Sequence, residues 1–291
     1  MSSKIVLGTA QFGLPYGVAN AHGQINLEEG RKLLDLAQAA EISTLDTAIA
    51  YGDSETVLGE LGVARWQVIS KLPAVPDDQL ASPLDWVLNQ VVESCARLAK
   101  DALHGLLLHR PAQLSGPHGG ALHDALIQAR KRGLVSKIGI SIYAPEELDA
   151  LPRSMVFDIV QAPLNVLDQR LLTSGWASRL RQMGCEVHVR SIFLQGLLLM
   201  DAATRPQRFS SWTSTWRLWN DWLADHRLSP LEACVRYTLQ MAEVDRVVIG
   251  VDSSDHLREI LAAAQGFLPP LPPEFRTTDI RLLNPSQWPQ P

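Results

Sequence analysis

The chain alternates short, largely apolar runs with longer segments in which apolar residues recur at helical spacing. Eight runs typical of buried strands occupy residues 4–9, 43–46, 67–71, 104–109, 137–141, 158–161, 186–190 and 246–250. Amphipathic windows typical of helices fill residues 26–40, 54–61, 83–98, 121–132, 145–151, 170–183, 230–241 and 254–264. This α/β alternation predicts a (β/α)8 TIM barrel, formed as a single domain by residues 1–291. No Gly-rich fingerprint follows any strand, which disfavours an open dinucleotide-binding sheet.

Two segments interrupt this rhythm. Residues 194–229 form a long, Trp-rich connection after the seventh strand. Its tryptophans share one face of a predicted helix: Trp212, Trp216, Trp219 and Trp222. This face either packs the insertion onto the barrel or forms an aromatic wall over a substrate. The Pro-rich tail, residues 266–291, is expected to wrap the barrel without regular structure, and its end either covers the catalytic mouth or docks outside it.

Composition narrows the class of protein. The 291 residues are 46% hydrophobic and carry a net charge of −5, so no basic field favours nucleic acid or an anionic membrane. The N-terminal segment has no apolar export region, and no apolar run is long enough to span a bilayer, so we expect a cytoplasmic protein. Three widely spaced cysteines, Cys95, Cys185 and Cys234, suit reduced thiols in a core and give no metal-ligand spacing. We therefore expect no metal site.

Four proton-handling residues follow consecutive predicted strands. Asp46 ends the second strand and Tyr51 lies in the turn after it, Lys71 ends the third, and His109 ends the fourth. In a parallel barrel these ends meet at one mouth. A nearby ammonium stabilises a phenolate, and a carboxylate keeps that ammonium charged, so the set predicts a proton donor to a carbonyl oxygen. Each residue alone also has an ordinary structural role, as a cap, a surface charge or a loop residue.

At this point the chain resembles the aldo-keto reductases, (β/α)8 enzymes that use nicotinamide cofactors. Residues 46–59, DTAIAYGDSETVLG, match the family pattern DTAxxYGxSExxLG. The resemblance extends through segments such as GLLLHRP, KIGIS and LQGLL over nearly the whole chain. It implies that Asp46, Tyr51, Lys71 and His109 form the catalytic tetrad.

The resemblance also implies a cofactor site, from which this chain departs. Ser141 and Gln161 match positions near the nicotinamide carboxamide, but Ile142 replaces an Asn that would hydrogen-bond it. Arg190 replaces a Tyr that would stack on the nicotinamide ring, and a guanidinium there suits stacking, a phosphate or a carboxylate. Ser191, the next residue after Arg190, is also expected to contact the cofactor.

The adenosine end of the expected cofactor site differs as well. Gly250 and Ser253 belong to the loop after the eighth strand, and Glu259 matches a position that contacts the adenine. Asp252 lies in that loop, where many NADP-dependent members carry Lys or Arg, and would repel a 2′-phosphate. The cofactor is therefore expected to be NADP or NAD.

These observations predict an NAD(P)-dependent oxidoreductase that reduces the aldehyde or ketone of a small polar, sugar-like substrate, with Tyr51 as general acid. Gln11, Tyr16 and Trp212 are the expected substrate contacts, although Tyr16 alternatively packs a tight turn. The alternatives are cofactor-independent acid-base chemistry, with Arg190 anchoring an anion, and a binding or regulatory subunit. We expect a small-molecule partner and a monomer or small homo-oligomer.

Overall fold

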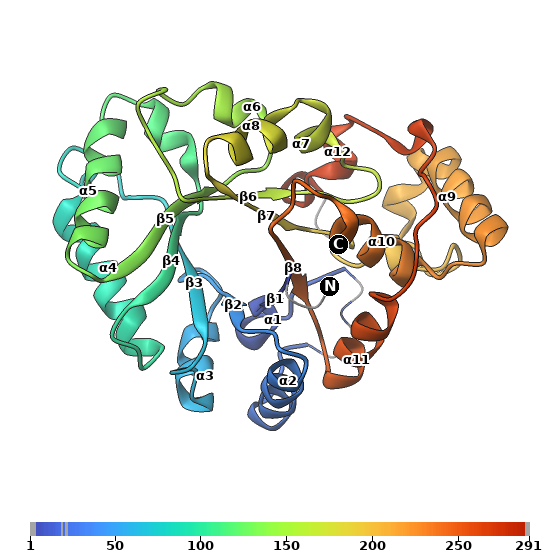
Figure 1. The fold of residues 1–291 in the computed structure, drawn as a ribbon, viewed down its shortest axis with the longest axis horizontal. Helices are drawn as coiled ribbons and strands as arrows, with labels where there is room; N and C mark the ends of the chain where they lie inside the picture. Colours follow the sequence, from blue (N-terminus) through green and yellow to red (C-terminus); the bar gives the residue numbers. More distant parts are fainter. Residues whose placement is uncertain (1–3, 19, 21–22, 289–291) are drawn as a thin grey trace.

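The structure, a computed structural model, describes residues 4–18, 20 and 23–288. Eight parallel strands close into a barrel in sequence order (Figure 1). They are β1 (Ile5–Gly8), β2 (Thr44–Asp46), β3 (Gln67–Leu72), β4 (Leu103–Leu108), β5 (Val135–Ser141), β6 (Ile159–Pro163), β7 (Glu186–Arg190) and β8 (Arg246–Gly250). The predicted (β/α)8 barrel is thereby confirmed, because each strand lies where an apolar run predicted one.

Helices surround the barrel and cover the outer face of the strands (Figure 1). They are α1 (Ala10–Gly13), α2 (Leu27–Ala39), α3 (Ser54–Leu61), α4 (Leu84–Arg97), α5 (Gly119–Lys131), α6 (Glu146–Asp149), α7 (Arg170–Thr173), α8 (Trp176–Gln182), α9 (Thr213–His226), α10 (Pro230–Gln240), α11 (Ser254–Ala263) and α12 (Ile280–Leu283). Short 3-10 turns are η2 (Pro111–Ser115), η3 (Leu197–Leu199), η4 (Gln207–Trp212), η5 (Pro273–Phe275) and η6 (Pro285–Gln287).

One predicted helix is divided in the structure. The window 170–183 contains α7 and α8, separated at Gly175, whose φ is +77°. Glycine adopts this left-handed conformation at little steric cost, so it ends one helical turn and begins the next. The amphipathic spacing continues across the break, which is why the sequence pattern did not reveal it.

Strand register brings the functional ends together. Gly8 of β1 pairs with Asp46 of β2 on one side and with Gly250 of β8 on the other. Lys71 of β3 lies one residue before the end of its strand, opposite Leu107 of β4. The carboxyl ends of β1, β2, β3 and β8 therefore meet at one mouth of the barrel, as the sequence predicted.

The Trp-rich insertion is packed rather than exposed. Trp219 is fully buried, and its ring stacks on Trp222 with centroids 6.0 Å apart. Phe275 from the tail meets both rings edge-on, at 5.7 and 5.6 Å. These aromatic contacts join α9 to the C-terminal tail and support the packing interpretation of this helix face.

The tail differs from its prediction because it contains helical turns. α12 and η6 lie within it, and Asp279 caps α12 by accepting from the backbone N–H of Arg281. Trp288 is buried against Phe209 of η4, with ring centroids 4.9 Å apart. Up to Trp288 the tail therefore docks on the insertion, and residues 289–291 lie outside the described part.

Two features are absent from the described residues: a membrane-spanning helix and a cluster of metal-binding side chains. No helix among residues 4–18, 20 and 23–288 has both the length and the apolar character needed to cross a bilayer. Within the same ranges, no group of three or more His, Cys, Asp or Glu side chains is arranged to hold a metal ion.

The Trp219 packing generates a stability prediction. Trp219→Ala removes a fully buried ring and the hydrogen bond that its indole N–H donates to the Leu198 carbonyl at 3.2 Å. The expected loss in free energy of unfolding is about 3–5 kcal/mol, measured by urea denaturation. Arg217→Ala, an exposed change on the same helix, is the control and should leave the denaturation midpoint nearly unchanged. Equal midpoints for both variants would contradict the packing account.

Candidate active site

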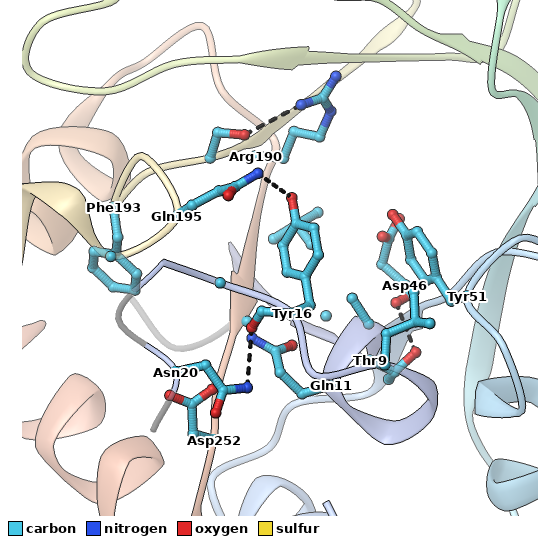
Figure 2. Close-up of a pocket in the computed structure, with 18 of the residues that line it drawn as sticks. Thr9, Gln11, Tyr16, Asn20, Asp46, Tyr51, Arg190, Phe193, Gln195 and Asp252 are labelled. Atoms are coloured by element: carbon cyan, nitrogen blue, oxygen red, sulfur yellow. Dashed lines mark hydrogen bonds between the residues drawn. The ribbon is translucent and has the colours of Figure 1, made fainter. Parts of the chain in front are cut away.

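A cavity of about 360 Å³ opens at the carboxyl ends of the strands. Its walls come from the segment after β1, from the ends of β2 and β4, and from the loops after β5, β7 and β8. Asp46, Tyr51 and His109 line it, and Arg190 and Asp252 bring two further charged groups. Figure 2 shows that Arg190 and Asp252 lie toward opposite ends of this space, with Tyr16 between them.

One side of the cavity is built on a buried ion pair between Lys71 and Asp46. Lys71 is fully buried, and its Nζ donates to Asp46 Oδ1 at 2.5 Å and to the Thr47 carbonyl at 2.9 Å. Burial alone would lower the pKa of Lys71, but the adjacent Asp46 carboxylate outweighs it, and the pKa is raised. Lys71 is therefore an ammonium at neutral pH. Two of its three N–H groups are used, which leaves one for the phenol or a ligand.

Tyr51 and His109 complete this group. Lys71 Nζ lies 5.1 Å from the centroid of the Tyr51 ring, and the rings of Tyr51 and His109 meet edge-on at 5.9 Å. Burial, followed by the positive charges of Lys71 and Arg190, lowers the pKa of His109 to about 4. The imidazole is therefore neutral at physiological pH and acts as a hydrogen-bonding group rather than a charge. The structure thus brings together all four residues that the sequence singled out.

The expected carboxamide site has a different arrangement. Gln161 is fully buried, and its amide nitrogen donates to Asp46 Oδ2 at 2.8 Å, while its oxygen accepts from Ser141 Oγ at 3.4 Å. Neither Gln161 nor Ser141 lines the cavity, and the Ile142 side chain is fully buried. Gln161 therefore holds the second oxygen of the Asp46 carboxylate.

Arg190 turns its guanidinium toward the loop after β5. Nη2 donates to the Ile142 carbonyl at 3.0 Å, Nη1 to Ser191 Oγ at 3.2 Å and Nε to Ser141 Oγ at 3.4 Å. The guanidinium carbon lies 4.6 Å from the centroid of the Tyr143 ring. These contacts fix the direction of the charge at the cavity wall.

The loop after β7 is conformationally unusual. Ser191, Leu194 and Gln195 have φ values of +59°, +49° and +55°, in the left-handed region that non-glycine residues rarely adopt. This conformation brings Gln195 to the segment after β1, where its Nε2 donates to the Tyr16 hydroxyl at 3.1 Å and its carbonyl accepts from Val18 N at 3.0 Å. Figure 2 shows the contact between Gln195 and Tyr16 across the cavity. Local strain is therefore held where two loops cross the mouth.

The side of the cavity near β8 is acidic. Asp252 lines it, and the Glu29 carboxylate accepts from Ser254 N at 2.5 Å, at the N-terminus of α11. Hydrogen bonds from Ser254, its backbone N–H first, hold the pKa of Glu29 below its ordinary value, so this carboxylate is charged at neutral pH. Ser253 does not line the cavity, because its side chain caps α11 by accepting from His256 N at 3.1 Å. Glu259 is exposed on α11 outside the lining.

Gln11 supplies an unsatisfied acceptor at this side. It is 7% exposed, and its Oε1 has no hydrogen-bond partner in the described part of the chain. A Cβ on Gly250 would lie 2.9 Å from Gln11 Nε2, so the glycine keeps the space open. A buried acceptor without a partner costs about 1–3 kcal/mol, which a ligand hydroxyl or amide would relieve. The β1–β8 side therefore offers a ligand an unpaired acceptor, whereas the expected carboxamide contacts, Ser141 and Gln161, do not line the cavity.

The cavity lining includes a further residue expected from the sequence and several that were not expected. Tyr16 lines the cavity, but Trp212 does not: its indole N–H donates to Asp279 at 3.1 Å. Tyr143, Phe193 and Gln195 line the cavity and were not expected there. An aromatic residue two positions after a predicted strand is a usable signal for Tyr143. No sequence signal reveals the left-handed loop that positions the other two.

Comparison with known proteins supports the resemblance found in the sequence. Residues 4–272 match the model of the Aldo/keto reductase family. The chain belongs to this family. Its members generally use NAD(P)H and act on carbonyl groups of small molecules.

Two curated proteins are similar to this chain in sequence. An oxidoreductase, sirO, from Leptosphaeria maculans is 27% identical over 221 residues, covering 72% of this chain and 66% of the relative. A 6-dehydroglucose reductase from Novosphingobium aromaticivorans is 32% identical over 140 residues, covering 42% and 44% of the two chains. The matches thus span less than two thirds of the length of either relative.

Solved structures agree on the fold. Aldo-keto reductase AKR11C1 from Bacillus halodurans superposes with a TM-score of 0.72 at 18% identity, covering 94% of this chain and 89% of its own. The glycerol dehydrogenase AKR11B4 from Gluconobacter oxydans gives 0.66 at 18% identity, covering 91% and 86%. At these identities the likeness shows the fold alone.

The buried ion pair generates a prediction for this family member. Asp46→Asn leaves the Lys71 ammonium buried without its counter-charge, which should lower the free energy of unfolding by about 3–5 kcal/mol in urea denaturation. Glu28→Gln is the matched control, because Glu28 pairs with Lys32 at 2.7 Å on the exposed surface of α2. Its denaturation midpoint should remain close to the wild type. A small, equal effect in both variants would show that Lys71 is not held as a charge.

Proposed function

We propose that the protein reduces the aldehyde or ketone of a small polar, sugar-like substrate with a nicotinamide cofactor. The observation that carries this proposal is the Tyr51 phenol beside a charged, fully buried Lys71 and a neutral His109, at the wall of one cavity. Membership of the family and the sugar reductase among the relatives support it.

The roles follow from the charges of these residues. A reduced nicotinamide, when bound in this cavity, would supply the hydride for the carbonyl carbon. Tyr51 gives its proton to the carbonyl oxygen as the C–O π bond opens, and solvent later restores that proton. Lys71 stabilises the resulting phenolate, and Asp46, held by Gln161, keeps Lys71 charged and in position. His109, as a neutral imidazole, orients the carbonyl oxygen by a hydrogen bond.

For the cofactor, the acidic side of the cavity favours NADH over NADPH. Asp252 lines the cavity near β8, and Glu29 already occupies the N–H of Ser254 at the start of α11. A 2′-phosphate near these carboxylates would be repelled, whereas a ribose hydroxyl can donate to a carboxylate. Arg258 lies nearby in sequence but is exposed and paired with Asp255.

Removal of the phenol tests the proton-transfer step. Tyr51→Phe should lower kcat for aldehyde reduction by roughly 10²- to 10⁴-fold, because the proton donor is lost. The dissociation constant of NADH, measured by fluorescence titration, should change little, since the hydroxyl serves the carbonyl. Retained kcat in Tyr51→Phe would reject the general-acid role. Turnover that needs no nucleotide but is lost in Tyr51→Phe would instead support cofactor-independent acid-base chemistry.

Charge removal near β8 tests the cofactor preference. The wild type should bind NADH at least about 10-fold more tightly than NADPH, and Asp252→Asn should narrow that ratio. Asp255→Asn is the matched control, because Asp255 is exposed, pairs with Arg258 and does not line the cavity. Fluorescence titration of both nucleotides measures the ratio. A wild-type preference for NADPH would overturn this assignment.

A further inference from the structure

Arg190 presents an incompletely used cation to the cavity. Its guanidinium has five N–H groups, and the contacts with Ser141, Ile142 and Ser191 engage one on each nitrogen. One N–H on Nη1 and one on Nη2 remain. A planar fork with a free donor on each of these nitrogens suits the two oxygens of a carboxylate.

No carboxylate of the described residues compensates this charge. Two other half-buried arginines are paired with carboxylates, Arg170 with Asp168 at 2.7 Å and Arg236 with Glu232 at 2.5 Å, whereas Arg205, outside this cavity, contacts the Met200 carbonyl and the Trp216 ring. Arg190 contacts only neutral oxygens and the Tyr143 ring, with no acid within 4 Å among residues 4–18, 20 and 23–288. The barrel wall thus holds a guanidinium whose charge is not balanced by a neighbouring carboxylate of the described residues.

The charges around the cavity place an anion at this end. Asp46 is neutralised by Lys71, and His109 is neutral at physiological pH, so Arg190 dominates the catalytic side. Asp252 lies toward the opposite end, beyond the contact between Tyr16 and Gln195 (Figure 2). An anionic group is therefore attracted to Arg190 and repelled from Asp252.

We propose that Arg190 binds the carboxylate of the substrate, so that the protein reduces small hydroxylated aldehydes or ketones that also carry an acid group. This inference rests on the proposed function and names its substrate class. Cofactor phosphate is the competing source of an anion. The Arg190 guanidinium contacts the loop after β5, at the end of the cavity opposite Asp252, whereas the adenosine end of the cofactor is expected near Asp252 and the loop after β8. The carboxylate takes no part in the hydride step and serves to orient the carbonyl toward Tyr51.

Paired substrates that differ only in charge test this assignment. We would compare glucuronate with glucuronamide, and succinate semialdehyde with 4-oxobutanamide, in the presence of NADH or NADPH. The wild type should show a higher kcat/KM for each acid than for its amide. In Arg190→Gln the acid-to-amide ratio should fall roughly 10- to 100-fold, because charge-assisted hydrogen bonds are lost. Arg190→Lys should restore part of the ratio, since it keeps the charge but loses the fork.

A second cation provides the matched control. Arg153→Gln removes the same charge from an exposed loop position before β6, outside the cavity lining, and should keep the wild-type ratio. A ratio that falls equally in both variants would show a general field effect rather than binding at Arg190, and would overturn the proposal.

The remaining outcomes distinguish failure of the carboxylate site from failure of the proposed reductase function. Equal kcat/KM for acid and amide in the wild type would overturn the carboxylate site and leave the reductase function standing. An unchanged ratio in Arg190→Gln, with a higher dissociation constant for NADH by fluorescence titration, would assign Arg190 to a cofactor phosphate and also overturn it. If the wild type reduces no member of either pair with either nucleotide, the proposed function fails and the inference fails with it.

Discussion

The buried ammonium of Lys71 sets the charge at the mouth of the barrel. Lys71 has no exposed surface, so it remains charged only because Asp46 faces it at 2.5 Å and Thr47 offers a carbonyl. Asp46 in turn is held on its other oxygen by Gln161. The positions of Tyr51 and His109 matter chemically because this pair sets the charge around them. The barrel provides the rigid frame, since each member comes from the end of a different strand or from the turn after it.

Besides Asp46, the charged groups that line the cavity are separated, with the cation toward one end and the anion toward the other. The Arg190 guanidinium lies on the side of β7, and the Asp252 carboxylate lies on the side of β8. Glu29 lies outside the lining, where it accepts from Ser254 N and has Lys32 at 3.8 Å. Gln161, which is the expected partner of a nicotinamide amide, instead supports Asp46, and the Ile142 carbonyl supports Arg190. The departures from the family pattern are thus connected: residues that would recognise a cofactor amide here hold the ion pair and a cation at the wall.

Sequence reasoning located the strands and the convergence of Asp46, Tyr51, Lys71 and His109 because both depend on local pattern. Apolar runs mark strands that are buried on both faces, and chemistry at strand ends converges in any parallel barrel. It failed at Gly175, where helical spacing continues through a break, and in the tail, where proline content concealed helical turns. It could not foresee Gln195 or Phe193 at the cavity, because left-handed backbone at Ser191 and Leu194 places them there. Nor could it show that Gln161 turns to Asp46, which depends on packing between strands distant in sequence.

The contact between Glu29 and the N-terminus of α11 joins residues 225 positions apart. Pairing of β1 with β8 spans a similar distance. Such nonlocal contacts are slow to form, and during synthesis they must wait until the last strand has left the ribosome. The tetrad, by contrast, lies between residues 46 and 109 and depends on neighbouring strands. In the nascent chain, the segment that carries Asp46, Tyr51, Lys71 and His109 is therefore complete in sequence long before the side of the mouth near β8, and ring closure is the step that joins them.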